Sequence, residues 1–216
     1  MTYSLNEIEA LCKRAARGVG LSWGIAEDAA KAVRWLASFD LPSVAPFAQV
    51  LALHDDMRDA DFAPMSLTGP WSASAGRLCP LLSGAALSDC AQLREGETAL
   101  VLSHVVYPVL LLPFAAQVAT RLQQVVMLSW DDLAVMSDGQ QIWLMDSKDQ
   151  CGAEIAETVT FSHAERPASS GRKPQVRGSA SAAVWAQLND FAHRTYAPAT
   201  EQSRLLGAGA GNSDND

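Results

Sequence analysis

The sequence lacks the residue spacings that mark a zinc site. Its four cysteines, Cys12, Cys79, Cys90 and Cys151, include no CxxC pair, and no His-x3-5-His motif accompanies them. Structural zinc sites are built from such closely spaced thiolate and imidazole ligands. The sequence therefore predicts no metal site.

A secretory signal peptide is also missing. Such a peptide begins with a basic segment and continues as an apolar run, whereas the first residues here are amphipathic and include Glu7 and Glu9. The missing signal peptide and the unpaired pattern of cysteines indicate free thiols in a reducing compartment. We therefore expect a cytoplasmic protein.

Positive charge is scarce. Sixteen Lys and Arg stand against 24 Asp and Glu, which gives a formal charge of −8. Proteins that bind nucleic acids usually carry a basic face that neutralises phosphate groups. The densest basic cluster here is Arg172, Lys173 and Arg177, in an expected loop. The composition predicts that nucleic acid is not a partner.

Motifs for nucleophilic catalysis and phosphate binding are absent as well. There is no G-x-S-x-G sequence, and no histidine adjoins a cysteine as a local base that could activate it. The GAGAG sequence at 207–211 lacks the Lys and Ser/Thr of a phosphate-binding loop. The sequence thus leaves the cofactor unknown.

One long uncharged stretch, 98–119, needs to be tested as a membrane span, which takes about 20 apolar residues. It contains Ser103, His104, Pro108 and Pro113, and no cluster of basic residues flanks it closely. We therefore expect no membrane segment but a buried strand followed by a core helix, with His104 buried beside a polar partner.

Helices are predicted at the N-terminus. Ser4 and Glu7 have the spacing of a capping box, in which each residue bonds a free N–H group at the helix start. Two further helices are expected after Ser22 and Ser43, with Glu27 in the first turn of the earlier one.

Strands are predicted in the second half of the chain, because Val, Met and alternating apolar residues recur there. Asp138 and Gly139 lie between two of these runs, and this residue pair is typical of a hairpin whose two central residues have positive φ. The expected strands cover 99–103, 124–130, 133–136, 141–145 and 155–163. A short helix is expected near 85–93 and a long one near 181–195.

The order of these elements predicts an α+β fold, with N-terminal helices, a central and mainly antiparallel sheet with a hairpin, and a C-terminal helix. We expect a single domain over 1–207, with the alternative of a helical lobe at 1–56 and a sheet lobe at 97–207. Residues 208–216 form a polar acidic tail.

Several polar residues are candidates for a site. Arg17, Trp23 and Glu27 flank a glycine-containing turn between two helices and could line a cleft for a small ligand, with Glu27 and His104 as catalytic groups. The alternative is that these residues cap helices and form surface ion pairs. His54 is followed by Asp55 and Asp56, which suggests a general base or a metal ligand, or else a histidine placed at a helix end.

The acidic tail offers a second set of ligand-binding candidates. Asp214, Asp216 and the terminal carboxylate gather three negative charges within three residues. The tail either stays solvated or folds back to offer carboxylates to a cation or to an Arg-lined cleft.

Residues 4–30, 107–119 (YPVLLLPFAAQVA) and 201–216 resemble a family of small bacterial proteins that carries a domain-of-unknown-function label. The resemblance implies a bacterial source and a complete, stand-alone chain, and it implies no activity, cofactor or partner. Two hypotheses follow from the residues. The chain is a small-molecule enzyme or ligand-binding protein with a cleft near its N-terminal helices, or it is a non-catalytic accessory subunit with a protein partner or a second copy of itself.

Overall fold

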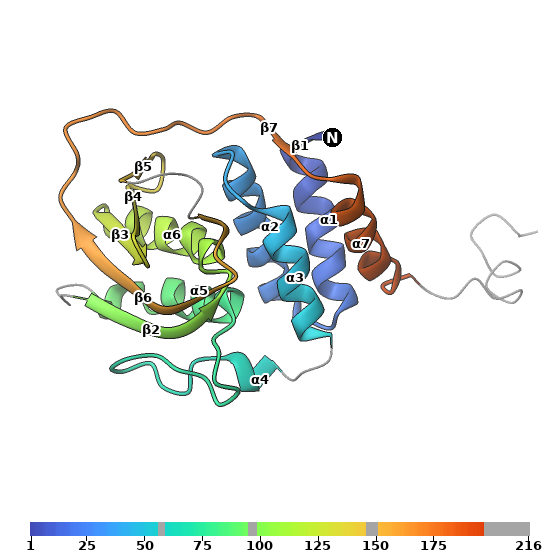
Figure 1. Cartoon of the computed structure of the whole chain (residues 1–216), viewed down its shortest axis with the longest axis horizontal. Coiled ribbons are helices and arrows are strands. Elements are labelled where there is room, and N and C mark those ends of the chain that lie inside the picture. The colour runs from blue at the N-terminus through green and yellow to red at the C-terminus, as the bar shows by residue number, and fades with distance from the viewer. Residues whose placement is uncertain (56–58, 95–98, 146–150, 197–216) are drawn as a thin grey trace, which may run out of the picture.

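The computed structural model describes residues 1–55, 59–94, 99–145 and 151–196. It has the predicted α+β architecture (Figure 1). The α-helices are α1 (Leu5–Gly18), α2 (Trp23–Ser38), α3 (Val44–His54), α4 (Asp59–Phe62), α5 (Pro80–Asp89), α6 (Leu112–Leu122) and α7 (Ala182–His193). Two 3-10 helices, η1 (Ala91–Arg94) and η2 (Pro108–Leu111), precede β2 and α6 respectively.

Two antiparallel sheets are present among the described residues. The larger one has the strand order β2-β6-β3-β4-β5, and the smaller one pairs β1 with β7. Their strands are β1 (Thr2–Ser4), β2 (Ala99–Val106), β3 (Val125–Trp130), β4 (Leu133–Ser137), β5 (Ile142–Leu144), β6 (Ile155–Ala164) and β7 (Arg177–Ser179).

Local sequence explains where the helices begin. The Ser4 hydroxyl accepts a hydrogen bond from the Glu7 N–H at 3.2 Å, and the Glu7 carboxylate accepts one from the Ser4 N–H at 2.8 Å. This is the predicted capping box, and these bonds from Ser4 lower the pKa of Glu7. The hydroxyls of Ser22 and Ser181 cap α2 and α7 by accepting from the N–H groups of Ile25 and Val184, without a reciprocal side-chain bond. Glu27 lies in the second turn of α2, because that helix begins at Trp23 and not later.

The predicted hairpin forms, but its turn differs from the expectation. Ser137 pairs with Ile142, which leaves four residues in the turn, and only Gly139 has a positive φ, of 92°. The Asp138 carboxylate instead accepts hydrogen bonds from the N–H groups of Gln140 and Gln141 at 2.9 and 2.8 Å. These side-chain bonds satisfy the turn with Asp138 outside the left-handed region.

The uncharged stretch at 98–119 contains β2, η2 and the first part of α6. Across the described residues, no helix has the length and apolar character needed to cross a membrane. The short helix expected at 85–93 begins earlier, since Pro80 occupies its first turn, where a missing N–H group breaks no hydrogen bond.

The elements form two groups that share one buried core (Figure 1). Helices α1, α2, α3 and α7 lie side by side, while α6 lies against β3 and β4 of the large sheet and α5 packs on α6. Contacts of α2 with α5 and α6 join the two groups. The segment between β6 and β7 returns from the sheet to the helices, so that β7 pairs with the N-terminal strand β1, with Thr2 opposite Ser179.

Candidate functional site

A pocket of about 820 Å³ lies where the helical group meets the sheet group. We call it the α2 pocket. Its lining comes from segments far apart in the chain: Leu5, Lys31, Arg34, Trp35, Ser38, Phe39, Gly139, Gln140, Gln141, Lys173, Pro174 and Gln175. Junctions of this kind are frequent places for small-molecule sites, and the volume is in the range of ligand pockets.

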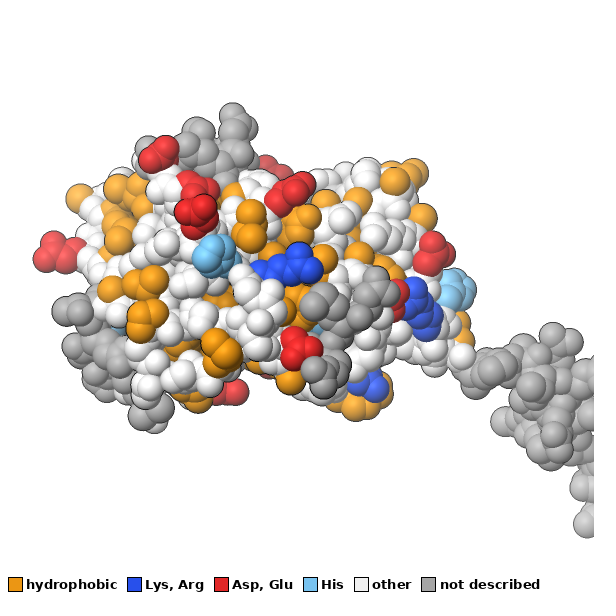
Figure 2. All heavy atoms as spheres, turned by 60° about the horizontal axis from the view of Figure 1, so that its bottom comes forward, with side chains coloured by type: hydrophobic (Ala, Val, Ile, Leu, Met, Phe, Trp, Pro, Cys, Tyr) orange, Lys and Arg blue, Asp and Glu red, His pale blue; other side chains and the backbone are white. Residues whose placement is uncertain are grey.

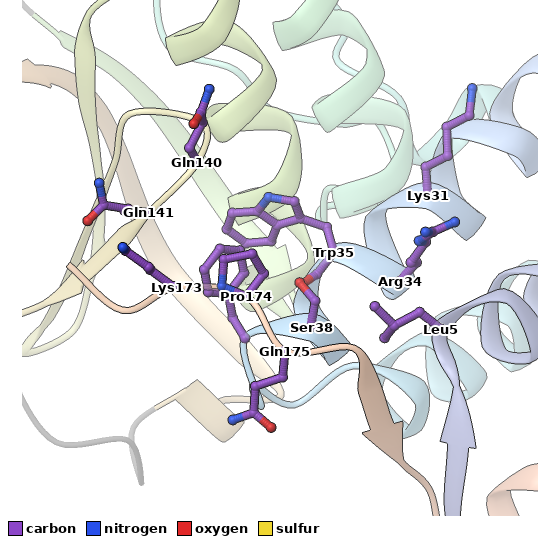
Figure 3. Close-up of a pocket in the computed structure, with 12 residues that line it drawn as sticks. Leu5, Lys31, Arg34, Trp35, Ser38, Gln140, Gln141, Lys173, Pro174 and Gln175 are labelled. Atoms are coloured by element: carbon purple, nitrogen blue, oxygen red, sulfur yellow. The ribbon is translucent and has the colours of Figure 1, made fainter.

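One face of α2 forms the first wall. Arg34 and Trp35 follow Lys31 by three and four residues, and Ser38 follows them by four and three. These four side chains therefore emerge on the same side of the helix. In Figure 3, Trp35 and Pro174 lie at the centre of the view, with Lys31 and Arg34 to one side. The helical pattern therefore brings two cations and an indole ring to one opening.

The second wall is the turn between β4 and β5, and the third is the segment that precedes β7. Backbone bonds hold them in place. Gln175 N donates to Ser38 O at 2.6 Å, and Arg172 N donates to Ile142 O at 2.7 Å. The Arg172 guanidinium also donates to Phe39 O at 3.1 Å. The third wall is thus bonded to α2 on one side and to the sheet on the other.

The charges around the pocket are of one sign. Lys31, Arg34 and Lys173 line it, and its lining includes no Asp or Glu. Lys31 Nζ lies 3.0 Å from Glu27 Oε1, and Arg34 Nη1 lies 2.6 Å from Glu9 Oε2, with both carboxylates outside the lining. Lys173 is exposed and forms no ion pair with a carboxylate of the described chain. An anion entering the pocket would meet cations from two walls.

Trp35 supplies the apolar surface. The centre of its ring lies 4.6 Å from the centre of the Phe39 ring, with an angle of 52° between the ring planes. The Trp35 side chain is partly exposed toward the pocket. The main chain beneath it is fixed, because the Ser38 hydroxyl donates to Trp35 O at 2.7 Å. A flat apolar group could therefore pack on the indole ring without moving the helix.

The residues proposed from sequence are only partly brought together. The Arg17 guanidinium lies 4.5 Å from the centre of the Trp23 ring, and Trp23 is 68% exposed. Glu27 bonds Lys13 and Lys31, and Lys31 foremost lowers the pKa of Glu27. Glu27 thus adjoins the α2 pocket through Lys31, whereas Trp23 lies eight residues, or about 12 Å, before Lys31 along the helix.

His104 is not buried as expected. It lies on β2 with its side chain exposed and a φ of 52°, and it is skipped in the pairing between Ser103↔Thr158 and Val105↔Ala156. Its carbonyl accepts a bond from Leu78 N at 2.9 Å, so a neighbouring segment fixes its backbone. The side chain then points out of the apolar stretch. No contact joins His104 to Glu27 among the interactions of the described residues.

The other candidates fall elsewhere. Asp214 and Asp216 lie outside the described residues. His54 lies at the end of α3, where it bonds both Asp59 and Cys79. The residues that sequence reasoning missed are Lys173 and Trp35. The sequence shows Lys173 only as part of a basic cluster, which by itself does not indicate a pocket.

Exposed apolar side chains are distributed over several segments of the described chain. The largest are Met1, Trp23, Met65, Leu67, Met145, Ile155, Val176 and Tyr196. On the face that carries α4, hydrophobic side chains occur in small groups between other side chains (Figure 2). This face therefore adds little support to the hypothesis of an accessory subunit with one large apolar patch.

Comparison with known proteins supports a relationship for the first part of the chain. Residues 3–79 match the family model described as "Protein of unknown function (DUF3726)", which confirms the resemblance to a domain-of-unknown-function family. No curated protein matches the chain. The solved malate dehydrogenase from Entamoeba histolytica is similar to it over 63% of this chain, with 11% sequence identity and a TM-score of 0.42. The matched part is 43% of that enzyme's chain, and a TM-score this low does not establish a common fold.

Proposed function

We propose that this protein binds a small organic anion in the α2 pocket, with an apolar part of the ligand packed on Trp35. The observation that carries the proposal is that all charged side chains lining the pocket are positive: three basic side chains and no acidic one surround a cavity of about 820 Å³. The chain as a whole has a formal charge of −8, so this local excess of positive charge runs against its composition.

The cations differ in how freely they can meet a ligand. Arg34 and Lys31 already have carboxylate partners, while Lys173 has none among the described residues. A ligand anion would therefore gain most from Lys173 and would share Lys31 with Glu27. Exposed charge pairs of this kind contribute about 0.2–1 kcal/mol each, so affinity requires the apolar contact with Trp35 as well.

The proposal is for binding and names no reaction. The lining residues include no Asp, Glu, His or Cys, the groups that most often act as acids, bases or nucleophiles. The earlier hypothesis, with Glu27 and His104 as catalytic groups and Arg17 and Trp23 as ligand contacts, stays a separate prediction. It differs in that it needs His104, which the α2 pocket does not include.

A matched pair of fluorescent probes tests the proposal. 1-Anilinonaphthalene-8-sulfonate carries an aromatic system and an anionic group, whereas N-phenyl-1-naphthylamine has the same rings without the sulfonate. We expect the native protein to bind the anionic probe more tightly. Lys173→Gln should weaken that binding about fivefold, because a cation near the sulfonate contributes about 1 kcal/mol. N-phenyl-1-naphthylamine should be unaffected.

Arg14→Gln is the control variant. It removes the same charge from α1, where Arg14 donates to the Tyr196 hydroxyl outside the pocket. Equal weakening by Lys173→Gln and Arg14→Gln would show a general charge effect and contradict the proposal. Loss of binding in both Glu27→Ala and His104→Ala, with Lys173→Gln unchanged, would support the alternative site instead.

A further inference from the structure

A second group of side chains lies away from the α2 pocket and is not used by the proposed function. His54 at the end of α3 bonds two partners: its Nδ1 lies 2.8 Å from Asp59 Oδ1, and its Nε2 lies 3.0 Å from Cys79 Sγ. We call these three residues the Cys79 cluster. An imidazole that joins a carboxylate to a thiol is the arrangement that activates a cysteine nucleophile.

The two hydrogen bonds fix the positions of the protons. The Asp59 carboxylate can only accept, so His54 donates from Nδ1 and presents the lone pair of Nε2 to the thiol. The Cys79 S–H then donates to that nitrogen. In this tautomer the imidazole is oriented as a base, and the carboxylate is placed to stabilise the imidazolium that forms when the thiol proton arrives.

The main chain supports the sulfur. Cys79 directly precedes α5, a helix of ten residues. Burial raises the pKa of the thiol to about 12, while the backbone N–H groups of Leu82 and Leu81 favour its charged form. The thiol is therefore protonated at rest and needs the neighbouring base to react. Cys79 N also donates to Phe62 O at 3.0 Å, which ties the cysteine to α4.

Solvent exposure falls from Asp59 to Cys79 along the cluster. The side chain of Asp59 is 45% exposed, that of His54 is 2% exposed, and Cys79 is 1% exposed. The charged end of the chain of hydrogen bonds is thus at the surface and the sulfur is inside. The ring of Phe62, whose carbonyl accepts the Cys79 N–H, lies 5.6 Å from that of His54 between ring centres. A reagent that reaches so buried a sulfur must be small and uncharged, because burial of a charge is costly.

We propose that Cys79 is a reactive thiol that small hydroperoxides oxidise, with His54 as its base and Asp59 as the residue that positions His54. In the step, the Cys79 thiol passes its proton to His54 Nε2 and the sulfur attacks one peroxide oxygen. The O–O bond breaks as the S–O bond forms, and the leaving hydroxide takes the proton from His54 as water. Sulfur loses two electrons and the peroxide gains them, so a thiol and hydrogen peroxide yield a sulfenic acid and water.

Cys12 is a matched internal control. It is also 1% exposed, and burial raises its pKa, but no base contacts its sulfur in the described structure. Intact protein is treated with hydrogen peroxide for set times, the peroxide is removed, and the protein is then denatured in the presence of dimedone, which captures sulfenic acids; labelling of each cysteine is followed by peptide mass spectrometry. We expect Cys79 to be labelled at least about tenfold faster than Cys12, because the two thiols are equally buried and only Cys79 has a positioned base.

Asp59→Asn separates base catalysis from simple opening of the structure. It keeps the shape of the side chain but removes the charge that stabilises the imidazolium, so labelling of Cys79 should slow about 10- to 100-fold, a part of the roughly 10²–10⁴-fold that general base catalysis contributes. If Cys79 reacted only when the surrounding structure opened, weakening the His54–Asp59 contact would accelerate labelling. An unchanged or faster rate in Asp59→Asn therefore overturns the proposal.

Two further measurements complete the test. His54→Gln should abolish rapid labelling by peroxide, while methyl methanethiosulfonate, a small neutral thiol reagent, reports whether Cys79 has become more accessible in that variant. Faster reaction with both reagents would show that opening governs the thiol and would contradict the proposal. In the native protein the bulky dianion 5,5′-dithiobis(2-nitrobenzoate) should react with Cys79 more slowly than the neutral reagent, and the reverse order would exclude a small, uncharged substrate.

Discussion

The α2 pocket and the Cys79 cluster both gather polar groups from several elements, but they do so under opposite conditions. The α2 pocket is open to solvent, and its cations from α2 and from the segment before β7 are screened by water. The Cys79 cluster is closed, and its hydrogen bonds run inward from the surface to a buried sulfur. Charge governs what enters the first region, and proton transfer governs reactivity in the second.

This difference has a physical cause. In water, two charges attract weakly and several contacts are needed for affinity, whereas in a dry interior one bond to a charged or polar group has a large effect. Changes of net charge should therefore act on the α2 pocket and leave the Cys79 cluster alone. The predictions below test that separation, in order of decreasing effect.

Reversing two charges of the α2 pocket should have the largest effect. In the double variant Lys31→Glu/Lys173→Glu, two attractions on the sulfonate of 1-anilinonaphthalene-8-sulfonate become repulsions, and each reversal should weaken binding about tenfold. Fluorescence titration should thus show a loss of about 100-fold in affinity. Labelling of Cys79 by peroxide should stay within about twofold of the native rate, since neither lysine contacts the cluster. A large change in labelling would show that the two regions are coupled.

Removal of the indole ring should have the next largest effect. Trp35→Ala takes away the apolar surface of the α2 pocket and should weaken binding of the same probe about tenfold, equivalent to ~1.4 kcal/mol. Trp35→Phe, which keeps a ring against Phe39, should retain most of the affinity. Calorimetric titration measures both variants, and thermal unfolding checks that each is folded. Equal loss in Ala and Phe would mean that the ring face is not the contact.

Salt should have a smaller effect, and it should weaken ligand binding at the α2 pocket without changing oxidation of Cys79. Charges at the open α2 pocket are screened over about 10 Å at 0.1 M salt. Raising sodium chloride from about 20 to about 300 mM should therefore weaken binding of the anionic probe by about three- to fivefold. The rate at which neutral peroxide oxidises Cys79 should not change. A salt-sensitive oxidation rate would indicate that the cluster is more open than its 1% exposed sulfur implies.

The smallest effect is expected at Glu27, and its sign is informative. Bonds from Lys31, together with Lys13, lower the pKa of Glu27, so its carboxylate is charged at neutral pH and competes for Lys31. Glu27→Gln should release Lys31 toward the pocket and tighten binding of the anionic probe about twofold. Under the hypothesis that Glu27 is itself a catalytic or ligand-binding group, the same change should weaken binding. Titration of the two proteins in parallel distinguishes the two outcomes.

Elements whose signals are local could be predicted from the sequence. The capping box of Ser4 and Glu7, the start of α2 after Ser22 and the Asp138-Gly139 hairpin all depend on residues within a few positions of one another. The detail of the hairpin was wrong because the Asp138 carboxylate bonds the turn itself. The burial of His104 was also wrong, since an apolar neighbourhood in the sequence does not fix which way one side chain points.

The candidate sites were harder to predict because their members are distant in the sequence. Lys173 joins Lys31 only because the segment before β7 bonds both α2 and β5. His54 is followed in the sequence by Asp55 and Asp56, but its carboxylate partner is Asp59. Cys79 lies 25 positions away, on the far side of a proline- and glycine-rich loop. No periodicity connects residues at such a separation.

What the sequence alone determined is the identity of the local elements and the acidic balance of the whole chain, because capping, hydrophobic periodicity and composition act over short distances or by simple addition. The tertiary structure decided where charge is concentrated against that balance and which cysteine has a base. Both depend on long-range backbone pairing: Arg172 with Ile142 sets the wall of the α2 pocket, and Cys79 with Phe62 places a thiol beside an imidazole. Such pairings are chosen by the packing of the entire core, and no single segment contains them.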